Sequence, residues 1–174
     1  MKIYITGSPG TGKTTISDNL TKLLSSQLDI KLIGIKSFLK EKDLLEEYER
    51  ERDTTIFDSN KAIEYLQKFL SPMESYILEG PLLPFNDIKF DYIIVLTCSK
   101  ANDLRKRLSK RNYRPEKINE NIEAELLGEV LGNTLDWLTT KKIYQEPIII
   151  DSCKLSKEEI LRKLKNLVIK DLEI

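Results

Sequence analysis

Eight consecutive residues near the amino terminus have the spacing of a loop that binds phosphate. Gly7–Thr14 read GSPGTGKT, which fits G-x-x-x-x-G-K-[ST] and lies between an apolar β-branched segment and an amphipathic one. Such a loop wraps its backbone N–H groups around a phosphate chain, and its glycines keep Cβ atoms away from the anion. Lys13 offers a cation to the β- and γ-phosphates, and the Thr14 hydroxyl suits Mg²⁺. These residues predict binding of a nucleoside triphosphate.

Two arginines could neutralise charge on a phosphoryl group during its transfer. Arg107 and Arg111 are four residues apart in a predicted helix, so both project from one face. A planar guanidinium suits phosphate oxygens better than an ammonium does. Lys106 and Lys110 stand beside them, and a solvated basic helix is the alternative interpretation. Next to an intact phosphate-binding loop we favour the phosphate role.

Glu79 is the carboxylate best placed to act beside the loop. It ends a short apolar run and precedes a glycine. A carboxylate at the carboxyl end of a parallel strand lies on the edge of the sheet where ligands bind. There it could hold Mg²⁺ through water or orient a nucleophile, and the alternative is an acid in a surface loop.

The elements that must position these residues alternate between short apolar runs and longer amphipathic stretches. This alternation is typical of an α/β fold, in which a parallel sheet carries helices on both faces. Strands are predicted at Lys2–Thr6, Lys31–Ile35, Ser75–Leu78, Tyr92–Thr97 and Pro147–Asp151. Helices are predicted at Lys13–Leu28, Asn60–Leu70 (capped by Asp58 or Ser59) and Asn102–Arg111, from about Glu116 onward, and after a capping box of Ser156 and Glu159. We expect one domain over residues 1–174.

Composition narrows the classes of function. The 28 Lys and Arg residues balance 28 Asp and Glu, so no global field favours nucleic acid or an anionic membrane. The chain has no histidine, which excludes imidazole bases and histidine metal ligands. Neither cysteine has metal-ligand spacing, and Cys98 ends an apolar run, where a buried thiol is expected. With no predicted leader or membrane span, we expect a reducing cytoplasm.

A charged segment follows the second predicted strand. Residues 41–53 hold seven acids together with Lys42, Arg50 and Arg52. A solvated helix and loop is the interpretation that composition favours. The position is also where a nucleotide kinase would carry an arm for its second substrate.

The chain resembles the adenylate kinase isoenzyme 6 family, also called the Fap7 family, over nearly its whole length. The phosphate-binding loop with its second threonine, Gly7–Thr15, is close to the family form. The block L-x-x-R-L-x-x-R-x-Y over Leu104–Tyr113 makes the resemblance specific, and it continues through Lys117, Glu120–Asn121 and Glu123–Glu125. The acidic, tyrosine-bearing stretch Glu46–Glu51 matches more loosely.

The resemblance implies a nucleoside-monophosphate-kinase fold with a parallel sheet in the order 2-3-1-4-5, an AMP-binding arm at about residues 34–57 and a short lid at about 110–120. It implies that ATP is held by Gly10, Gly12, Lys13, Thr14, Thr15 and Arg111. The family transfers phosphate from ATP to AMP with Mg²⁺ and also hydrolyses ATP. It acts in maturation of the small ribosomal subunit, bound to a platform ribosomal protein, and its contact with pre-ribosomal RNA would be indirect.

Three residues depart from the family pattern. Pro81 replaces the histidine of an acid-x-His motif whose acid is Glu79, and ATP hydrolysis is the activity we expect to suffer most. Lys40 stands where the family often has an arginine for the monophosphate, so a point charge replaces a bidentate fork. Asn112 replaces the usual glycine of the lid.

The leading hypothesis is an adenylate-kinase-type enzyme. Lys13 and Arg111 would stabilise the transferring phosphoryl group with help from Arg107, Glu79 would organise the Mg²⁺ shell together with Thr14, and Lys40 would bind AMP. The alternative is a ribosome-assembly factor in which ATP binding and hydrolysis switch a contact with a ribosomal protein. A kinase for another small acceptor is a third interpretation, because kinases with this loop share one scaffold.

Overall fold

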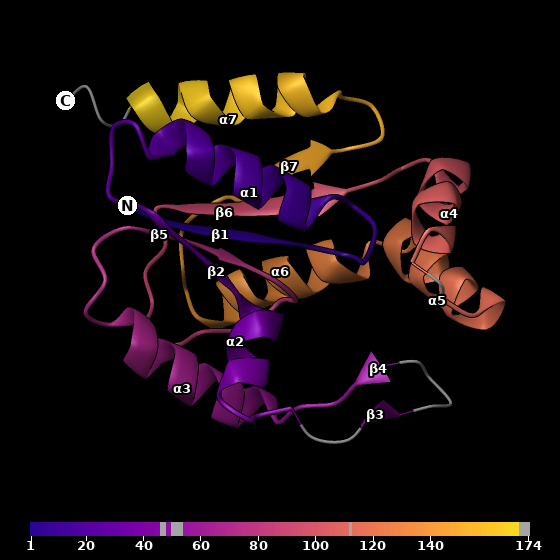
Figure 1. The fold of residues 1–174 in the computed structure, drawn as a ribbon, viewed down its shortest axis with the longest axis horizontal. Helices are drawn as coiled ribbons and strands as arrows, with labels where there is room; N and C mark the ends of the chain where they lie inside the picture. The colour runs from indigo at the N-terminus through magenta and orange to yellow at the C-terminus, as the bar shows by residue number, and fades with distance from the viewer. Residues whose placement is uncertain (46–47, 50–53, 112, 171–174) are drawn as a thin grey trace.

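A five-stranded parallel sheet forms the centre of the computed structural model, which describes residues 1–45, 48–49, 54–111 and 113–170 (Figure 1). Its strands are β1 (Lys2–Gly7), β2 (Lys31–Gly34), β5 (Tyr76–Glu79), β6 (Tyr92–Thr97) and β7 (Ile148–Asp151). They lie in the order β2-β5-β1-β6-β7, and every neighbouring pair is parallel. Counted along the chain this is 2-3-1-4-5, so the predicted fold class and strand order are confirmed.

Helices cover both faces of the sheet because the central strand alternates its side chains between two apolar cores. Ile3 and Ile5 face one core, which α1 (Lys13–Leu24) and α7 (Lys157–Lys170) cover. Tyr4 faces the other core, which α3 (Ser59–Leu70) and α6 (Glu129–Thr140) cover. Figure 1 shows α1 and α7 above the sheet and α3 and α6 below it.

The second core contains the chain's single tryptophan. Trp137 of α6 is buried, and its ring packs edge-on against Tyr4 with 6.3 Å between the ring centroids. Its indole Nε1–H donates a hydrogen bond to the backbone oxygen of Phe85 at 3.1 Å. The one polar group of the buried indole is therefore hydrogen-bonded. This matters because a buried donor without a partner would destabilise the fold.

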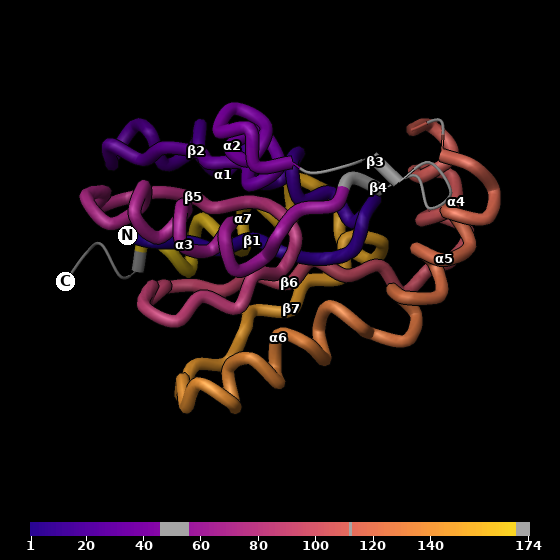
Figure 2. The backbone as a smooth tube through the Cα atoms, turned by 90° about the horizontal axis from the view of Figure 1, so that it is seen from below, coloured from indigo at the N-terminus to yellow at the C-terminus, as the bar shows by residue number. Residues whose placement is uncertain are grey.

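Two further groups of elements follow the carboxyl ends of β6 and β2 in the chain. The helices α4 (Ala101–Ser109) and α5 (Pro115–Leu126) lie together at the right of Figure 1, and Figure 2 shows them at the same end of the sheet. They share a third, small apolar cluster with the end of β6. On the other side, α2 (Ile35–Glu41) and the hairpin of β3 (Tyr48–Glu49) and β4 (Thr54–Thr55) fall within the predicted AMP arm.

Several predicted boundaries are wrong by one or more residues. The long helix expected from Glu116 is two helices, because Gly128 adopts φ 70° and begins α6. Leu126, expected on the apolar stripe, is therefore 55% exposed at the break. The first helix ends at Leu24 rather than Leu28, and the second strand ends at Gly34 because Ile35 already begins α2.

Two predicted helix caps are confirmed. The carboxylate of Asp58 accepts hydrogen bonds from the backbone N–H groups of Asn60 and Lys61 at the start of α3. Ser156 and Glu159 form the predicted capping box, with each side chain accepting from the backbone N–H of the other. Among the described helices, none combines the length and apolar character that a bilayer crossing requires.

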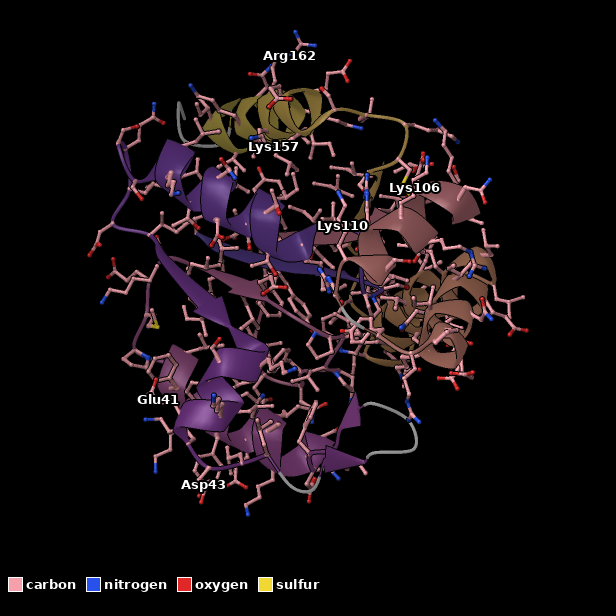
Figure 3. All side chains as sticks on the ribbon, turned by 45° about the vertical axis from the view of Figure 1, so that its right-hand side comes forward. Glu41, Asp43, Lys106, Lys110, Lys157 and Arg162 are labelled. Atoms are coloured by element: carbon pink, nitrogen blue, oxygen red, sulfur yellow. A yellow bond between two sulfur atoms is a disulfide. The ribbon has the colours of Figure 1, made fainter. Side chains whose placement is uncertain are left out.

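The charged segment after α2 is described only in part. Glu41 and Asp43 project from the end of α2 and are exposed, as a solvated segment predicts (Figure 3). The prediction of an arm for a second substrate rests partly on residues 46–47 and 50–53, which lie outside the described residues. The same holds for Asn112 in the predicted lid.

Candidate functional site

The phosphate-binding loop stands at the carboxyl edge of the sheet, where β1 passes into α1. Gly7 at the end of β1 is paired in register with Leu96 of β6, so the loop begins beside the end of a second strand. Gly10, at the turn of the loop, has φ 87°, and a Cβ there would lie 2.7 Å from the Cδ1 of Leu104 in α4. The loop therefore packs directly against α4 and needs a residue without a side chain at this position.

Lys13 bends back over the loop that precedes it. Its Nζ donates hydrogen bonds to the backbone oxygens of Gly7 at 2.8 Å and Ser8 at 3.1 Å. Burial lowers the pKa of the ammonium to about 8, while the carboxylate of Glu79 opposes that shift and the charge of Arg111 adds to it. The site thus disfavours the charged form of the lysine relative to water, and a bound phosphate would raise its pKa again.

Glu79 contacts Thr14 across the loop, and both residues are predicted Mg²⁺ ligands. The Thr14 hydroxyl donates to the Glu79 Oε1 at 3.4 Å, in an exposed position. Partial burial raises the pKa of Glu79 above its ordinary value, against the lowering effects of Lys13 and of the Thr14 hydroxyl. A hydroxyl and a carboxylate are oxygen ligands of the kind Mg²⁺ accepts, and this ion usually takes few protein ligands and completes its shell with phosphates and water. The two side chains fit such an ion.

One cavity of about 380 Å³ opens on the α1 side of the loop. We call it the donor cavity; its lining residues are Gly10, Thr11, Gly12, Thr15, Ile16, Arg107, Arg111, Ser152, Leu155, Ser156, Lys157 and Ile160. Its walls therefore come from the loop, from α4 and from the segment that leads from β7 into α7. Five of the predicted ATP-binding or catalytic residues lie in this wall, and Lys13 and Thr14 lie next to it in the chain.

Arg107 and Arg111 differ in what they bind. The guanidinium of Arg107 donates to the Ser152 backbone oxygen at 2.8 Å, the Ser152 hydroxyl at 3.0 Å and the Gly10 oxygen at 3.4 Å. It thereby ties the loop to the far wall of the donor cavity. Arg111 is exposed in the same cavity, and its charge acts on both Lys13 and Glu79. Arg111 is the better placed of the two for a phosphoryl group.

A second cavity of about 340 Å³ lies on the opposite side of the loop. We call it the acceptor cavity; it is lined by Pro9, Ile35, Lys36, Leu39, Leu45, Phe57, Pro81, Tyr113, Lys117 and Asn121. Lys40, predicted to bind the monophosphate, is exposed one helical turn after Lys36 and is absent from this wall. Sequence reasoning missed Lys36 and Phe57, and it gave no role to Lys117 and Asn121. The spacing of four residues between Lys36 and Lys40 was the available signal.

Pro81 lines the acceptor cavity at the position where the resemblance placed a histidine. Its backbone oxygen accepts a hydrogen bond from the Tyr4 hydroxyl at 2.6 Å, and that hydroxyl accepts one from the Leu83 N–H at 2.8 Å. Burial raises the pKa of Tyr4 above its ordinary value, so the phenol stays protonated and keeps donating. The hydroxyl of Tyr4 in β1 therefore holds the turn that follows Glu79.

The expected thiol at Cys98 is not a free thiol. Its side chain is buried, as predicted, but it forms a disulfide with Cys153, which is 55 residues away in the sequence. Cys98 follows β6 and Cys153 follows β7, and these neighbouring parallel strands bring the two sulfurs together. The prediction of a thiol failed because a pairing between residues 55 positions apart leaves no mark in local spacing.

The parallel sheet and the phosphate-binding loop at its carboxyl edge define a P-loop kinase fold. The chain is similar over 98% of its length to a deoxyadenosine kinase from M. mycoides, at 20% identity and a TM-score of 0.58, and it covers 99% of that chain. Residues 3–128 match the family model described as an AAA domain.

Relatives over most of the chain define the family more closely. A protein of Methanocaldococcus jannaschii named "Putative adenylate kinase" is 35% identical over 164 residues, which cover 91% of this chain and 89% of the relative. The Saccharomyces cerevisiae protein named adenylate kinase isoenzyme 6 homolog FAP7 is 29% identical over 95% of this chain and 79% of its own length. The chain belongs to the adenylate kinase isoenzyme 6 family.

Proposed function

We propose that this protein transfers a phosphoryl group from ATP to AMP. The observation that carries the proposal is that one loop separates two cavities: Pro9 lines the acceptor cavity, and Gly10, its neighbour in the chain, lines the donor cavity. Two nucleotides bound in these cavities would meet at the tip of the phosphate-binding loop, beside Lys13. Holding two reactants in contact is the main task of an enzyme that transfers a phosphoryl group.

The chain's own residues would support an in-line displacement. An oxygen of the acceptor monophosphate forms a bond to the γ-phosphorus while the bond to the β–γ bridging oxygen breaks, and the electron pair leaves with the diphosphate. The acceptor is already an anion, so no general base is required. Lys13 would leave the Gly7 and Ser8 oxygens and follow the γ-phosphoryl group, and Arg111 would neutralise charge from the other side.

Thr14 and Glu79 would hold Mg²⁺ beside the bound phosphates. The ion would supply positive charge at the β- and γ-phosphate oxygens. Arg107 would act on the donor indirectly, because its hydrogen bonds fix the Ser152 segment that forms the far wall of the donor cavity.

The acceptor cavity favours transfer over the alternative of an ATP-driven switch on a ribosomal protein. A switch needs one nucleotide site, whereas this loop borders two cavities. AMP as the acceptor is proposed from the names of the relatives, and the mostly apolar walls of the cavity suit a base.

An assay of ATP consumption with each nucleoside monophosphate, and with none, tests the proposal. We expect ADP formation that depends on AMP and little turnover without it, since Pro81 occupies the position of the histidine that the family pattern carries. Turnover that is equal with and without every monophosphate would favour the ATPase switch instead.

The acceptor side can be tested by comparing two lysines on one helix. Replacing Lys36 by alanine removes the only lysine of α2 that lines the acceptor cavity in the described part of the chain. We expect the KM for AMP to rise about tenfold, the loss typical of one charge-assisted contact to phosphate. Lys40→Ala is the matched variant, and steady-state kinetics in which it has the larger effect would restore Lys40 as the monophosphate ligand.

Proton uptake reports on the loop lysine. In the free protein the pKa of Lys13 is about 8, and bound phosphates should raise it toward or above the ordinary value of 10.5. Above pH 8 the free lysine is mostly neutral whereas the complex keeps the proton, so affinity for ATP should fall by about tenfold per pH unit. Calorimetric titrations at pH 9 in buffers of different ionisation enthalpy should show net proton uptake.

Lys157→Ala is the control for proton uptake, because it removes an exposed lysine from the same cavity. This variant should still take up a proton when ATP binds. Binding of ATP to the unaltered protein without proton uptake at pH 9 would contradict the expected change at Lys13.

A further inference from the structure

The helix α5 carries one wall of the acceptor cavity and is held mainly against α4, where Arg105 also donates a hydrogen bond to Asn119 at 2.8 Å. Lys117 and Asn121 of α5 line the cavity, together with Tyr113 just before the helix. The apolar contacts of α5 are with a small cluster in which Ile118 and Ile122 join two leucines of α4 and Cys98. This cluster is separate from the two larger cores that hold the sheet and its covering helices. The position of this wall therefore depends on a small number of interactions.

Glu125 provides a direct bond between this helix and the sheet. It is 9% exposed and is the one charged residue among the buried polar residues of the described chain. Its Oε1 accepts a hydrogen bond from the backbone N–H of Cys98 at 2.5 Å. A carboxylate is kept away from water only where such a partner compensates for the lost hydration. The bond is therefore what makes the buried position tolerable.

The other end of that bond is rigid. Cys98 directly follows β6, the strand paired with β1 at the start of the phosphate-binding loop. Its sulfur is joined to Cys153, which follows the neighbouring strand β7. Glu125 thus bonds α5 to a fixed point on the carboxyl edge of the sheet, next to the loop where the two cavities meet.

The same face of α5 makes the bond and lines the cavity. Asn121 stands four residues before Glu125, which is about one helical turn, and it is also 9% exposed. A rotation or shift of α5 that broke the Glu125 bond would move Asn121 and Lys117 in the acceptor wall. The donor cavity would be spared, because none of its lining residues belongs to α5.

We propose that Glu125 is a positioning residue that sets the acceptor cavity by holding α5 against the backbone of Cys98. The part of the inference that concerns AMP rests on the proposed function. The anchoring of α5 by Glu125 does not depend on that function. The anchor requires a side-chain oxygen that can reach the backbone N–H of Cys98. The length of the side chain at position 125 therefore matters more than its charge. The attraction between Glu125 and Lys13 is a second, electrostatic effect that a charge-neutral variant separates from the first.

Three variants of Glu125 and one control distinguish these roles. Glu125→Gln keeps an oxygen that can accept the Cys98 N–H, Glu125→Asp keeps the charge but is too short, and Glu125→Ala removes both. Glu123→Ala is the control, because Glu123 is an exposed acid on the same helix. Calorimetry with AMP, and separately with a non-hydrolysable ATP analogue, measures the two cavities in folded protein, with circular dichroism checking the fold.

We expect Glu125→Ala and Glu125→Asp to weaken AMP binding about tenfold, as for loss of one hydrogen bond. Binding of the ATP analogue should change no more in Glu125→Ala than in Glu125→Gln, since both lose the attraction to Lys13. Glu125→Gln and Glu123→Ala should bind AMP like the unaltered protein. Unchanged AMP binding in folded Glu125→Ala and Glu125→Asp would overturn the proposal. So would equal losses for both nucleotides, which would indicate a general stabilising role, or a loss in Glu125→Gln as large as in Glu125→Ala, which would indicate an effect of charge.

Amide hydrogen exchange separates failure of this inference from failure of the proposed function. Exchange over α5 should be faster in Glu125→Ala than in Glu123→Ala, while exchange over α1 should be the same in both. If the unaltered protein binds no AMP but α5 responds in this way, the kinase proposal fails and the anchor stands. If α5 exchanges at the same rate in both variants, the anchor is refuted whatever nucleotide binds.

Discussion

Replacing Lys13 by alanine should lower the rate of AMP-dependent ADP formation by about 10²–10³-fold, the loss typical of removing one preorganised charge from the site of transfer. In the described structure the Lys13 ammonium lies at the centre of the loop, where it donates to the Gly7 and Ser8 oxygens and would exchange these acceptors for a phosphoryl group. Lys157, the lysine in the described lining of the donor cavity, belongs to α7 rather than to the loop.

The fold of this variant should be retained, since the lysine makes its hydrogen bonds within the loop. Lys22→Ala is the matched control, because Lys22 is an exposed lysine on the same helix and should be silent in the assay. Coupled-enzyme kinetics at saturating ATP and AMP measure the effect, with thermal unfolding as the check on folding. A rate for Lys13→Ala within a few-fold of normal would refute the assignment of the transfer site.

Replacing Gly7 by alanine should destabilise the protein by about 3 kcal/mol or more, because the new methyl group has no room and the backbone is strained. A Cβ at Gly7 would lie 2.2 Å from the backbone oxygen of Leu96 and 2.9 Å from the Thr11 Oγ1. The φ of Gly7 is +147°, which side chains rarely adopt. The obstacle is the backbone of the paired strand β6, which can move only if the sheet itself opens. Urea denaturation measures the change.

Gly132→Ala is the control, and it should act in the opposite direction. Gly132 lies inside α6, where a Cβ would meet nothing within 4 Å. An alanine there should stabilise the protein by about 0.5–1 kcal/mol, since glycine is the poorer helix former. If both variants were equally stable, the close approach of β1 and β6 at Gly7 would not be as tight as described.

The fold could be predicted because its signals are local. Short apolar runs separated by amphipathic stretches indicate a parallel sheet, and Gly7–Thr14 identify the first strand and the first helix. The strand order came from the resemblance and is confirmed. The break between α5 and α6 was missed, because the apolar spacing continues across Gly128 and only its left-handed backbone stops the helix.

The position of a site residue could be predicted where it depends only on the strand or helix that carries the residue. Thr14 and Glu79, both predicted to hold Mg²⁺, lie within hydrogen-bond distance of each other at the carboxyl edge of the sheet. The bonds of Arg107 to Ser152, the disulfide of Cys98 and the bond from Glu125 all join segments remote in sequence. Contacts of that kind depend on how elements pack, and no spacing within one segment encodes them.

The burial of Trp137 gives the protein an internal optical probe. Its indole is the only one in the chain, lies 5% exposed among aromatic rings and lines neither the donor nor the acceptor cavity. Its fluorescence should therefore be emitted at short wavelength in the folded state and shift to the red when the core around Tyr4 opens. Because neither nucleotide should touch this chromophore, a change in its emission reports unfolding of Gly7→Ala or Gly132→Ala rather than contact with ligand.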